Sequence, residues 1–131
     1  MKTILVVEDN VHTNKVINEF LRDAGYNVLT AFDGEQALEK IFNNKVDLCI
    51  LDIMLPKLSG TEILAEIRKN SNVAVIMLTA LDDEPTQIKS FNLSADEYVT
   101  KPFSPVVLVK RVEALLRRIY PDTDSIKEFQ K

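Results

Sequence analysis

The stretch ILDIMLPKLSG, residues 50–60, begins as an apolar run, meets one carboxylate at Asp52 and then breaks into a turn that contains Pro, Ser and Gly. Further apolar runs occur at residues 4–7, 28–32, 73–78 and, more weakly, 97–100. Because these runs do not alternate with polar residues, they predict strands covered on both faces, which is typical of a parallel sheet. The question is what a charge does at the end of such a strand.

Between these runs, apolar residues recur at helical spacing. The expected helix faces are Val16, Ile17, Phe20, Leu21 and Ala24; Ala37, Leu38, Ile41 and Phe42; Ile63, Leu64 and Ile67; and Leu108, Val109, Val112, Leu115, Leu116 and Ile119. A further helix over about 83–92 has a thinner apolar face, Ile88 and Phe91. Helix starts are marked by the pairs Ser59/Glu62 and Asp33/Gln36 and by Ser104-Pro105, and Gly25 marks a helix end.

The alternation of strands and helices predicts an α/β fold of the (βα)5 kind. Right-handed crossovers place helices on both faces of the sheet, which gives a flavodoxin-like, doubly wound parallel sheet with strand order 2-1-3-4-5. We expect one domain over residues 1–118. Residues 119–131 are polar and lack the helical period, which indicates a linker or C-terminal tail.

Composition excludes several classes of function. Sixteen Lys and Arg against twenty Asp and Glu give a net charge of −4, which disfavours direct nucleic-acid binding by this segment. The lone Cys49 lies in an apolar run and reads as a core residue in a reducing compartment. No stretch is long enough for a membrane span, and the start lacks the apolar stretch of a signal peptide. We therefore expect a cytoplasmic location and no membrane partner.

The polar residues at the expected strand ends are chemically complementary. In an open α/β sheet these ends share one edge, where ligands bind. Acidic ligands on adjacent strands suit a hard cation such as Mg²⁺, and a hydroxyl and a lysine suit the charge of a phosphoryl group. The residues concerned are Glu8 and Asp9 after the first strand, Asp52 after the third, Thr79 after the fourth and Lys101 after the fifth. This set indicates phosphoryl transfer to a carboxylate nucleophile, Asp52.

The motifs VVEDN, LDIMLPKLSG, LTA and YVTKPF occur in an order and spacing that resemble the receiver domain of two-component response regulators, over about residues 3–118. The resemblance implies that Asp52 accepts a phosphoryl group from a sensor histidine kinase. It also implies a Mg²⁺ site formed by Asp9, Asp52 and the backbone carbonyl of Met54, with Glu8 acting through water. Such a domain is a signalling switch and no enzyme beyond its own phosphorylation and dephosphorylation.

The same resemblance assigns the switch residues. It implies that Lys101 pairs with a phosphoryl oxygen, that Thr79 moves to hydrogen-bond it, and that Tyr98 changes rotamer. It also implies a cis peptide bond before Pro102. Taken without the resemblance, Thr79, Lys101 and Tyr98 would each be ordinary strand-end or packing residues. His12, the only histidine, is expected at an exposed or rim position.

The sequence around SADEYVTKPFSP is most like receivers that precede a winged-helix DNA-binding domain and form a homodimer on phosphorylation. The resemblance implies that phosphorylation switches a surface of the fourth helix, fifth strand and fifth helix to control output, and that this surface forms the dimer. It places Asp96, Glu97, Lys110 and Arg111 on that dimer face. This chain departs from the usual pattern at Gln87 and Val107, which removes one ion pair, and at Ser94, where glycine is common. A stand-alone regulator that signals by protein contact remains the alternative.

Two other functions stay open on the same architecture. A phosphatase of the haloacid-dehalogenase kind would need a second acid two residues after Asp52, where Met54 stands, and an FMN carrier would not place two acids in its first loop. No G-x-G-x-x-G motif occurs.

The apolar residues Met54 and Leu81 also suggest that the phosphorylated form is shielded from water and decays slowly.

Overall fold

The computed structural model describes residues 1–80 and 95–121. The five strands form one sheet in the order β2-β1-β3-β4-β5, with every neighbouring pair parallel, as the sequence predicts. The strands are β1 Thr3–Val7, β2 Asn27–Ala31, β3 Leu48–Asp52, β4 Ala74–Ala80 and β5 Glu97–Lys101. All five runs of the sequence are therefore strands, and β1, β3 and β4 lie inside the sheet.

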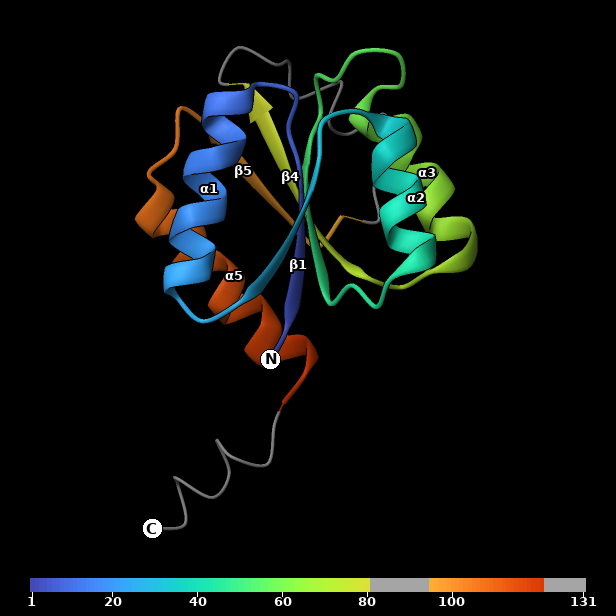
Figure 1. Cartoon of the computed structure of the whole chain (residues 1–131). Coiled ribbons are helices and arrows are strands. Elements are labelled where there is room, and N and C mark those ends of the chain that lie inside the picture. Colours follow the sequence, from blue (N-terminus) through green and yellow to red (C-terminus); the bar gives the residue numbers. More distant parts are fainter. Residues whose placement is uncertain (81–94, 122–131) are drawn as a thin grey trace, which may run out of the picture.

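Four helices lie in the described part of the chain: α1 Val11–Asp23, α2 Gly34–Asn43, α3 Gly60–Asn70 and α5 Pro105–Ile119. Helices α1 and α5 cover one face of the sheet, and α2 and α3 cover the other (Figure 1). The helix expected over about 83–92, together with Leu81, Gln87 and Ser94, lies outside the described residues. The arrangement is the doubly wound fold that the sequence predicts.

The residues that mark helix ends in the sequence form helix caps in the structure. Ser59, Asp33 and Ser104 are N-caps whose side chains accept hydrogen bonds from the backbone N–H groups of Glu62, Gln36 and Val107, respectively. Helix α1 ends in a Schellman turn, because Gly25 N–H donates to Arg22 O, Tyr26 N–H donates to Leu21 O, and Gly25 has a φ of 99°. These contacts fix where each helix begins or ends.

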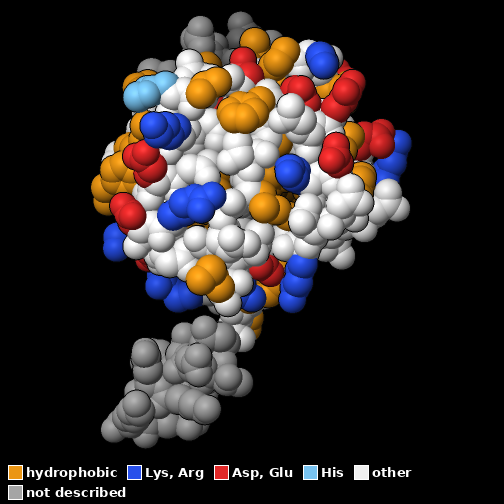
Figure 2. Space-filling view, viewed as in Figure 1, with side chains coloured by type: hydrophobic (Ala, Val, Ile, Leu, Met, Phe, Trp, Pro, Cys, Tyr) orange, Lys and Arg blue, Asp and Glu red, His pale blue; other side chains and the backbone are white. Residues whose placement is uncertain are grey.

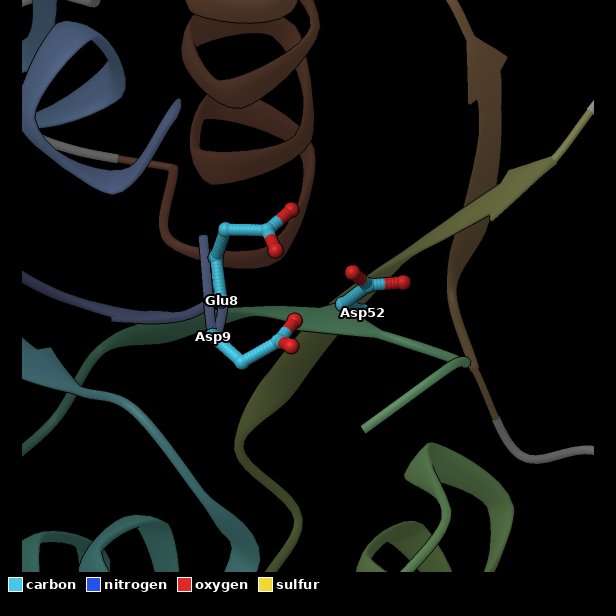
Figure 3. A group of neighbouring side chains, drawn as sticks. All are labelled: Glu8, Asp9 and Asp52. Atoms are coloured by element: carbon cyan, nitrogen blue, oxygen red, sulfur yellow. The ribbon is translucent and has the colours of Figure 1, made fainter. Parts of the chain in front are cut away.

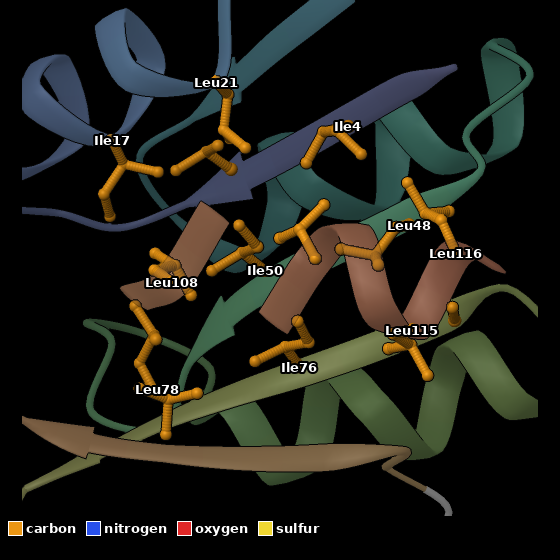
Figure 4. Packing of buried hydrophobic residues seen from close by; sticks show 14 of the residues in the cluster. Ile4, Ile17, Leu21, Leu48, Ile50, Ile76, Leu78, Leu108, Leu115 and Leu116 are labelled. Carbon is orange, nitrogen blue, oxygen red and sulfur yellow. The ribbon is translucent and has the colours of Figure 1, made fainter. Parts of the chain in front are cut away.

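Two apolar clusters fill the space between the sheet and its helices. The cluster under α1 and α5 includes the labelled side chains of Figure 4, among them Ile50 and Leu115, and the cluster under α2 and α3 includes Cys49 and Ile63. Burial raises the pKa of the Cys49 thiol to about 12, which fits the expected core role. The prediction that Phe20 and Phe42 face the core is wrong, because the two residues are 38% and 51% exposed.

The end of α5 packs against the start of β1. Tyr120 donates its hydroxyl to Asp47 O at 3.3 Å, and Lys2 Nζ lies 4.0 Å from the centre of its ring. Ile119 and Tyr120 both pack against the cluster under α1 and α5, so ordered structure continues just past residue 118. In the part of the chain that the structure describes, no helix is long and apolar enough to cross a membrane. Charges of both signs are interspersed on the face shown in Figure 2, without a basic patch there.

Candidate functional site at the carboxyl edge of the sheet

Three carboxylates converge where β1 and β3 end. Glu8 directly follows β1, Asp9 begins the loop to α1, and Asp52 is the last residue of β3 (Figure 3). One carboxylate oxygen from each lies within 4.8 Å of the other two. The paired register of β1 and β3, Val7 with Leu51, explains why Glu8 and Asp52, 44 positions apart along the chain, meet at this edge.

Lys101 connects two of these carboxylates. Its Nζ donates to Asp52 Oδ2 at 2.7 Å and to Glu8 Oε1 at 2.9 Å. Both acids are buried, with 3% of Asp52 and 1% of Glu8 exposed, so the lysine supplies the charge that each needs in the interior. Burial opposes the charge on Lys101, but the hydrogen bonds and charges of Asp52 and Glu8 outweigh it and raise the pKa of the lysine. Lys101 therefore stabilises the two buried carboxylates in their charged form.

Backbone donors hold the remaining oxygens of the two buried acids. Met54 N–H donates to Asp52 Oδ1 at 3.1 Å, and Asn10 N–H donates to Glu8 Oε2 at 3.1 Å. Each carboxylate is thus fixed on one side by Lys101 and on the other by the loop that follows its own strand. This arrangement orients the Asp52 carboxylate toward the edge of the sheet.

Asp9 differs from the other two acids because its residue is exposed. Burial, a hydrogen bond with Glu8 and the Glu8 charge raise the pKa of Asp9, and its own backbone and Lys101 only partly offset them. Three carboxylates whose oxygens lie within 4.8 Å of one another repel when ionised, and a bound cation relieves that repulsion. An all-oxygen donor set on a solvent-facing edge fits a hard ion such as Mg²⁺.

The other expected switch residues lie near this edge. Thr79 is 1% exposed near the end of β4, and its hydroxyl lies 3.4 Å from Ala80 O. Tyr98 is half-buried on β5 beside the cluster under α2 and α3, and burial raises the pKa of its hydroxyl. The Lys101-Pro102 bond is cis, which confirms that prediction. His12 is exposed, as expected.

Three of the four residues expected on the dimer face have partners within the chain. Asp96 Oδ2 accepts from Val75 N–H at 2.8 Å and lies 3.4 Å from Arg68 Nη2, at the opposite end of β4 from the acidic cluster. Arg111 Nη1 lies 2.6 Å from Glu97 Oε1, and the fourth residue, Lys110, is exposed. Asp96 therefore joins β4, β5 and α3 in the single chain, whereas Glu97 and Arg111 form a surface pair.

Sequence reasoning missed two residues that shape the site, Asn10 and Asn14. Asn10 is the N-cap of α1 and accepts from Thr13 N–H. Asn14 is 1% exposed, and its side chain bonds two carbonyls, those of Glu8 and Ala31. The signal for Asn10 was an asparagine just before an apolar periodic stretch. The signal for Asn14 was a polar residue in the stripe of Ile17 and Leu21.

A cavity of about 600 Å³ opens beside Lys101, between α1 and the start of α5. Its walls are mostly apolar and come from His12, Thr13, Val16, Ile17, Ala80, Lys101, Pro102, Phe103 and Pro105. The buried polar centre of the site is thus adjoined by a mostly apolar surface.

Comparison with known proteins gives a consistent result. The family described as the response regulator receiver domain matches residues 4–113. Response regulator RR06 of Streptococcus pneumoniae is 48% identical over 117 residues, which are 89% of this chain and 54% of that protein. The alkaline phosphatase synthesis transcriptional regulatory protein PhoP of Bacillus subtilis is 45% identical over 89% of this chain and 49% of that protein. The chain thus spans about half the length of the curated relatives it matches.

Solved structures agree. The receiver domain of the Francisella response regulator 1452 aligns with a TM-score of 0.83 and 36% identity, covering 91% of this chain and 99% of that one. The response regulator TrrA of Thermotoga maritima, in complex with Mg²⁺ and BeF, aligns with a TM-score of 0.79 and 42% identity, covering 88% of this chain and 100% of that one. With the acidic cluster at the edge of a sheet of matching topology, the chain belongs to the receiver domain family of two-component response regulators, whose members are signalling switches.

Proposed function

We propose that Asp52 accepts a phosphoryl group from the phosphohistidine of a sensor histidine kinase, in the cytoplasm and with Mg²⁺. The observation that carries this proposal is the joint contact of one lysine, Lys101, with Asp52 and Glu8 inside an acidic cluster. A carboxylate nucleophile beside acids and a cation is the set that phosphoryl transfer needs, and the match to receiver domains supports the same assignment.

In the proposed step, a carboxylate oxygen of Asp52 attacks phosphorus and forms an acyl phosphate. The P–N bond of the donor breaks, and its electron pair stays on the imidazole nitrogen, which then takes a proton. Lys101 moves its hydrogen bond from the carboxylate to an oxygen of the phosphoryl group, where a fixed cation stabilises the charge. Met54 N–H keeps the carboxylate oriented during the attack, as its 3.1 Å contact suggests.

Glu8, Asp9, Asp52 and the carbonyl of Met54 would hold the Mg²⁺ ion, with Glu8 reaching it through water. When bound, the ion neutralises charge on the phosphoryl oxygens. The oxygen-only donor set of the cluster supports this assignment, and the TrrA complex contains Mg²⁺.

Thr79 and Tyr98 carry the signal away from Asp52 in this proposal. Thr79 lies on β4, the strand next to Asp52, and β5 with Tyr98 is the following strand, so a short chain of neighbouring strands links the site to the β5 and α5 surface. Phosphorylation then favours a homodimer through Asp96, Glu97, Lys110 and Arg111.

The proposed output is transcription, exerted by a DNA-binding part beyond this segment rather than by direct nucleic-acid binding here. The support is that relatives such as PhoP are named transcriptional regulators and are about twice as long as the matched region. The alternative is a stand-alone regulator that acts by protein contact.

Intact mass measurement tests the proposal. With Mg²⁺ and a small phosphodonor, the wild type should gain the mass of one phosphoryl group, and removal of Mg²⁺ by a chelator should prevent the gain. Asp52→Asn should not gain it, whereas Asp23→Asn, an exposed change at the far end of α1, should behave like the wild type. Equal modification of Asp52→Asn would show that the acceptor lies elsewhere.

A further inference from the structure

Asn14 is a polar side chain in an apolar position. It is 1% exposed and lies on the stripe of α1 that also buries Ile17 and Leu21. A buried amide without hydrogen-bond partners is destabilising, so the hydrogen bonds of Asn14 decide whether the position is tolerable. Nδ2 donates to Glu8 O at 3.0 Å and to Ala31 O at 3.2 Å. Oδ1 accepts from Asn18 Nδ2 at 2.9 Å. The amide is therefore satisfied on all sides.

The bond to Glu8 O acts on the acidic cluster through the backbone. This carbonyl belongs to the peptide group that joins Glu8 to Asp9. Asn14 therefore fixes the orientation of the peptide plane on the N-terminal side of Asp9. The preceding peptide group is fixed as well, because Glu8 N–H donates to Ala31 O at 3.1 Å. Two successive peptide groups at the end of β1 are thus held in place, one of them by Asn14.

This restraint matters because the three carboxylates of the cluster repel one another. Glu8 and Asp52 share Lys101, but Asp9 is the exposed member, and no salt bridge involves it in the part of the chain described. A freely rotating loop would let Asp9 turn outward, away from the other two carboxylates. A fixed backbone holds the carboxylates of Glu8, Asp9 and Asp52 close together before a cation binds. Binding then does not have to order them.

We propose that Asn14 is a positioning residue for Mg²⁺, which holds Glu8 and Asp9 in register with Asp52 through the Glu8–Asp9 peptide group. The inference rests on the Mg²⁺ binding proposed above. It goes beyond it by linking α1, whose outer residues His12 and Lys15 are exposed, to the metal affinity of the site. A contact that displaces α1 would then change Mg²⁺ affinity.

Calorimetric titration of the whole 131-residue chain with Mg²⁺ tests this, at a temperature where every protein is folded. Asn14→Leu removes both donors and keeps a side chain branched at the same atom, whereas Asn14→Ser leaves room for a water to bond the two carbonyls and protects folding. Both should raise the Kd for Mg²⁺ about tenfold, the scale measured for residues that orient metal ligands.

Asn18→Ala is the matched control. Asn18 lies one turn further along α1 and bonds Asn14 and Thr30 but not Glu8, so its loss should lower stability and leave the Kd within about twofold. If Asn14 has only a structural role, its variants should likewise lose stability while the Kd for Mg²⁺ stays within about twofold. Unchanged Kd values in Asn14→Ser and Asn14→Leu would overturn the inference, while a wild type that does not bind Mg²⁺ would overturn the proposed metal site instead.

A measurement on the wild type covers the case in which both Asn14 variants fail to fold. In a heteronuclear NMR titration, the side-chain amide of Asn14 should shift with the same Mg²⁺ midpoint as the backbone amide of Asp9. The side-chain amide of Asn44, which donates to Lys40 O on an exposed helix end, should not shift. An Asn14 amide that stays unmoved while Asp9 shifts would contradict the positioning role.

Discussion

Met54 lies where the proposed phosphorylation site meets solvent. Its residue is 67% exposed, although its N–H is fixed on Asp52 Oδ1. An apolar side chain beside an acyl phosphate cannot orient a water molecule for attack on phosphorus, which is the geometry that hydrolysis requires. Leu81, the second shielding residue suggested by the sequence, lies outside the described residues.

We therefore expect Met54→Asn to shorten the lifetime of the phosphorylated chain several-fold, since an amide could hold a water in line. The measurement is intact mass over time after removal of the donor. Met54→Leu, which keeps an apolar group of similar size, should decay at the wild-type rate. Identical decay of Met54→Asn and the wild type would mean that the lifetime is set by other groups, such as Lys101.

At the scale of the secondary-structure elements, backbone contacts tightly constrain the junction of β3 and α3. Gly60 N–H donates to Ile53 O at 2.8 Å, and a Cβ on Gly60 would lie 2.3 Å from Asp52 O and 2.7 Å from Ile53 Cα. The turn after β3 must therefore return onto the strand that carries the phosphorylation site. This close approach explains the glycine at the end of the motif LDIMLPKLSG.

Gly60→Ala should lower the free energy of unfolding by about 1–3 kcal/mol, because backbone atoms must move to admit the methyl group. Urea unfolding measures this change. Gly25→Ala is the control for conformation alone: it has open space around it, and its φ of 99° makes it cost about 1 kcal/mol. A loss for Gly60→Ala no larger than that for Gly25→Ala would contradict the argument from close approach.

At the scale of the whole molecule, the two ends of the sheet have different tasks. The carboxyl edge holds the acidic cluster, while the opposite edge holds Asp47, whose carboxylate accepts from Thr3 N–H at 2.8 Å and whose carbonyl accepts from Tyr120. The end of α5 is thereby tied to the start of β1, and Figure 1 shows the N-terminus beside the end of α5. Any chain that continues from Pro121 thus leaves from an anchored point.

The proposed dimer gives a prediction at this scale. Phosphorylated protein should associate weakly with two-fold symmetry, because exposed ion pairs contribute only about 0–1 kcal/mol each and Val107 provides no charge. Sedimentation over a concentration series measures the association. Arg111→Glu should weaken it, and combination with Glu97→Arg should restore it, since the two residues already pair in one chain.

Lys45→Glu, the same charge change in the loop between α2 and β3, serves as the control for net charge. It should leave association unchanged. If phosphorylated wild type stays monomeric at high concentration, the dimer proposal is wrong and the stand-alone regulator is favoured.

The sequence by itself determined the elements and their order. Apolar runs, caps such as Ser59 and the glycine at position 25 act over a few residues, so strands, helix ends and the side-by-side strand ends could be predicted. It also identified the polar residues that meet at the carboxyl edge, because parallel strands bring their ends together whatever their separation along the chain.

Only the tertiary structure decided which of these groups touch. Lys101 bonds Glu8 across 93 residues, Asn14 reaches two strand ends from inside an apolar stripe, and Asp96 pairs with Arg68 within the chain. Local sequence patterns indicate whether a residue is polar and on which face of its element it lies. A hydrogen bond between elements depends on how far apart they pack in the tertiary structure. Helix α1 must dock on β1 and β2 before the Asn14 amide can hold the peptide group that carries Asp9.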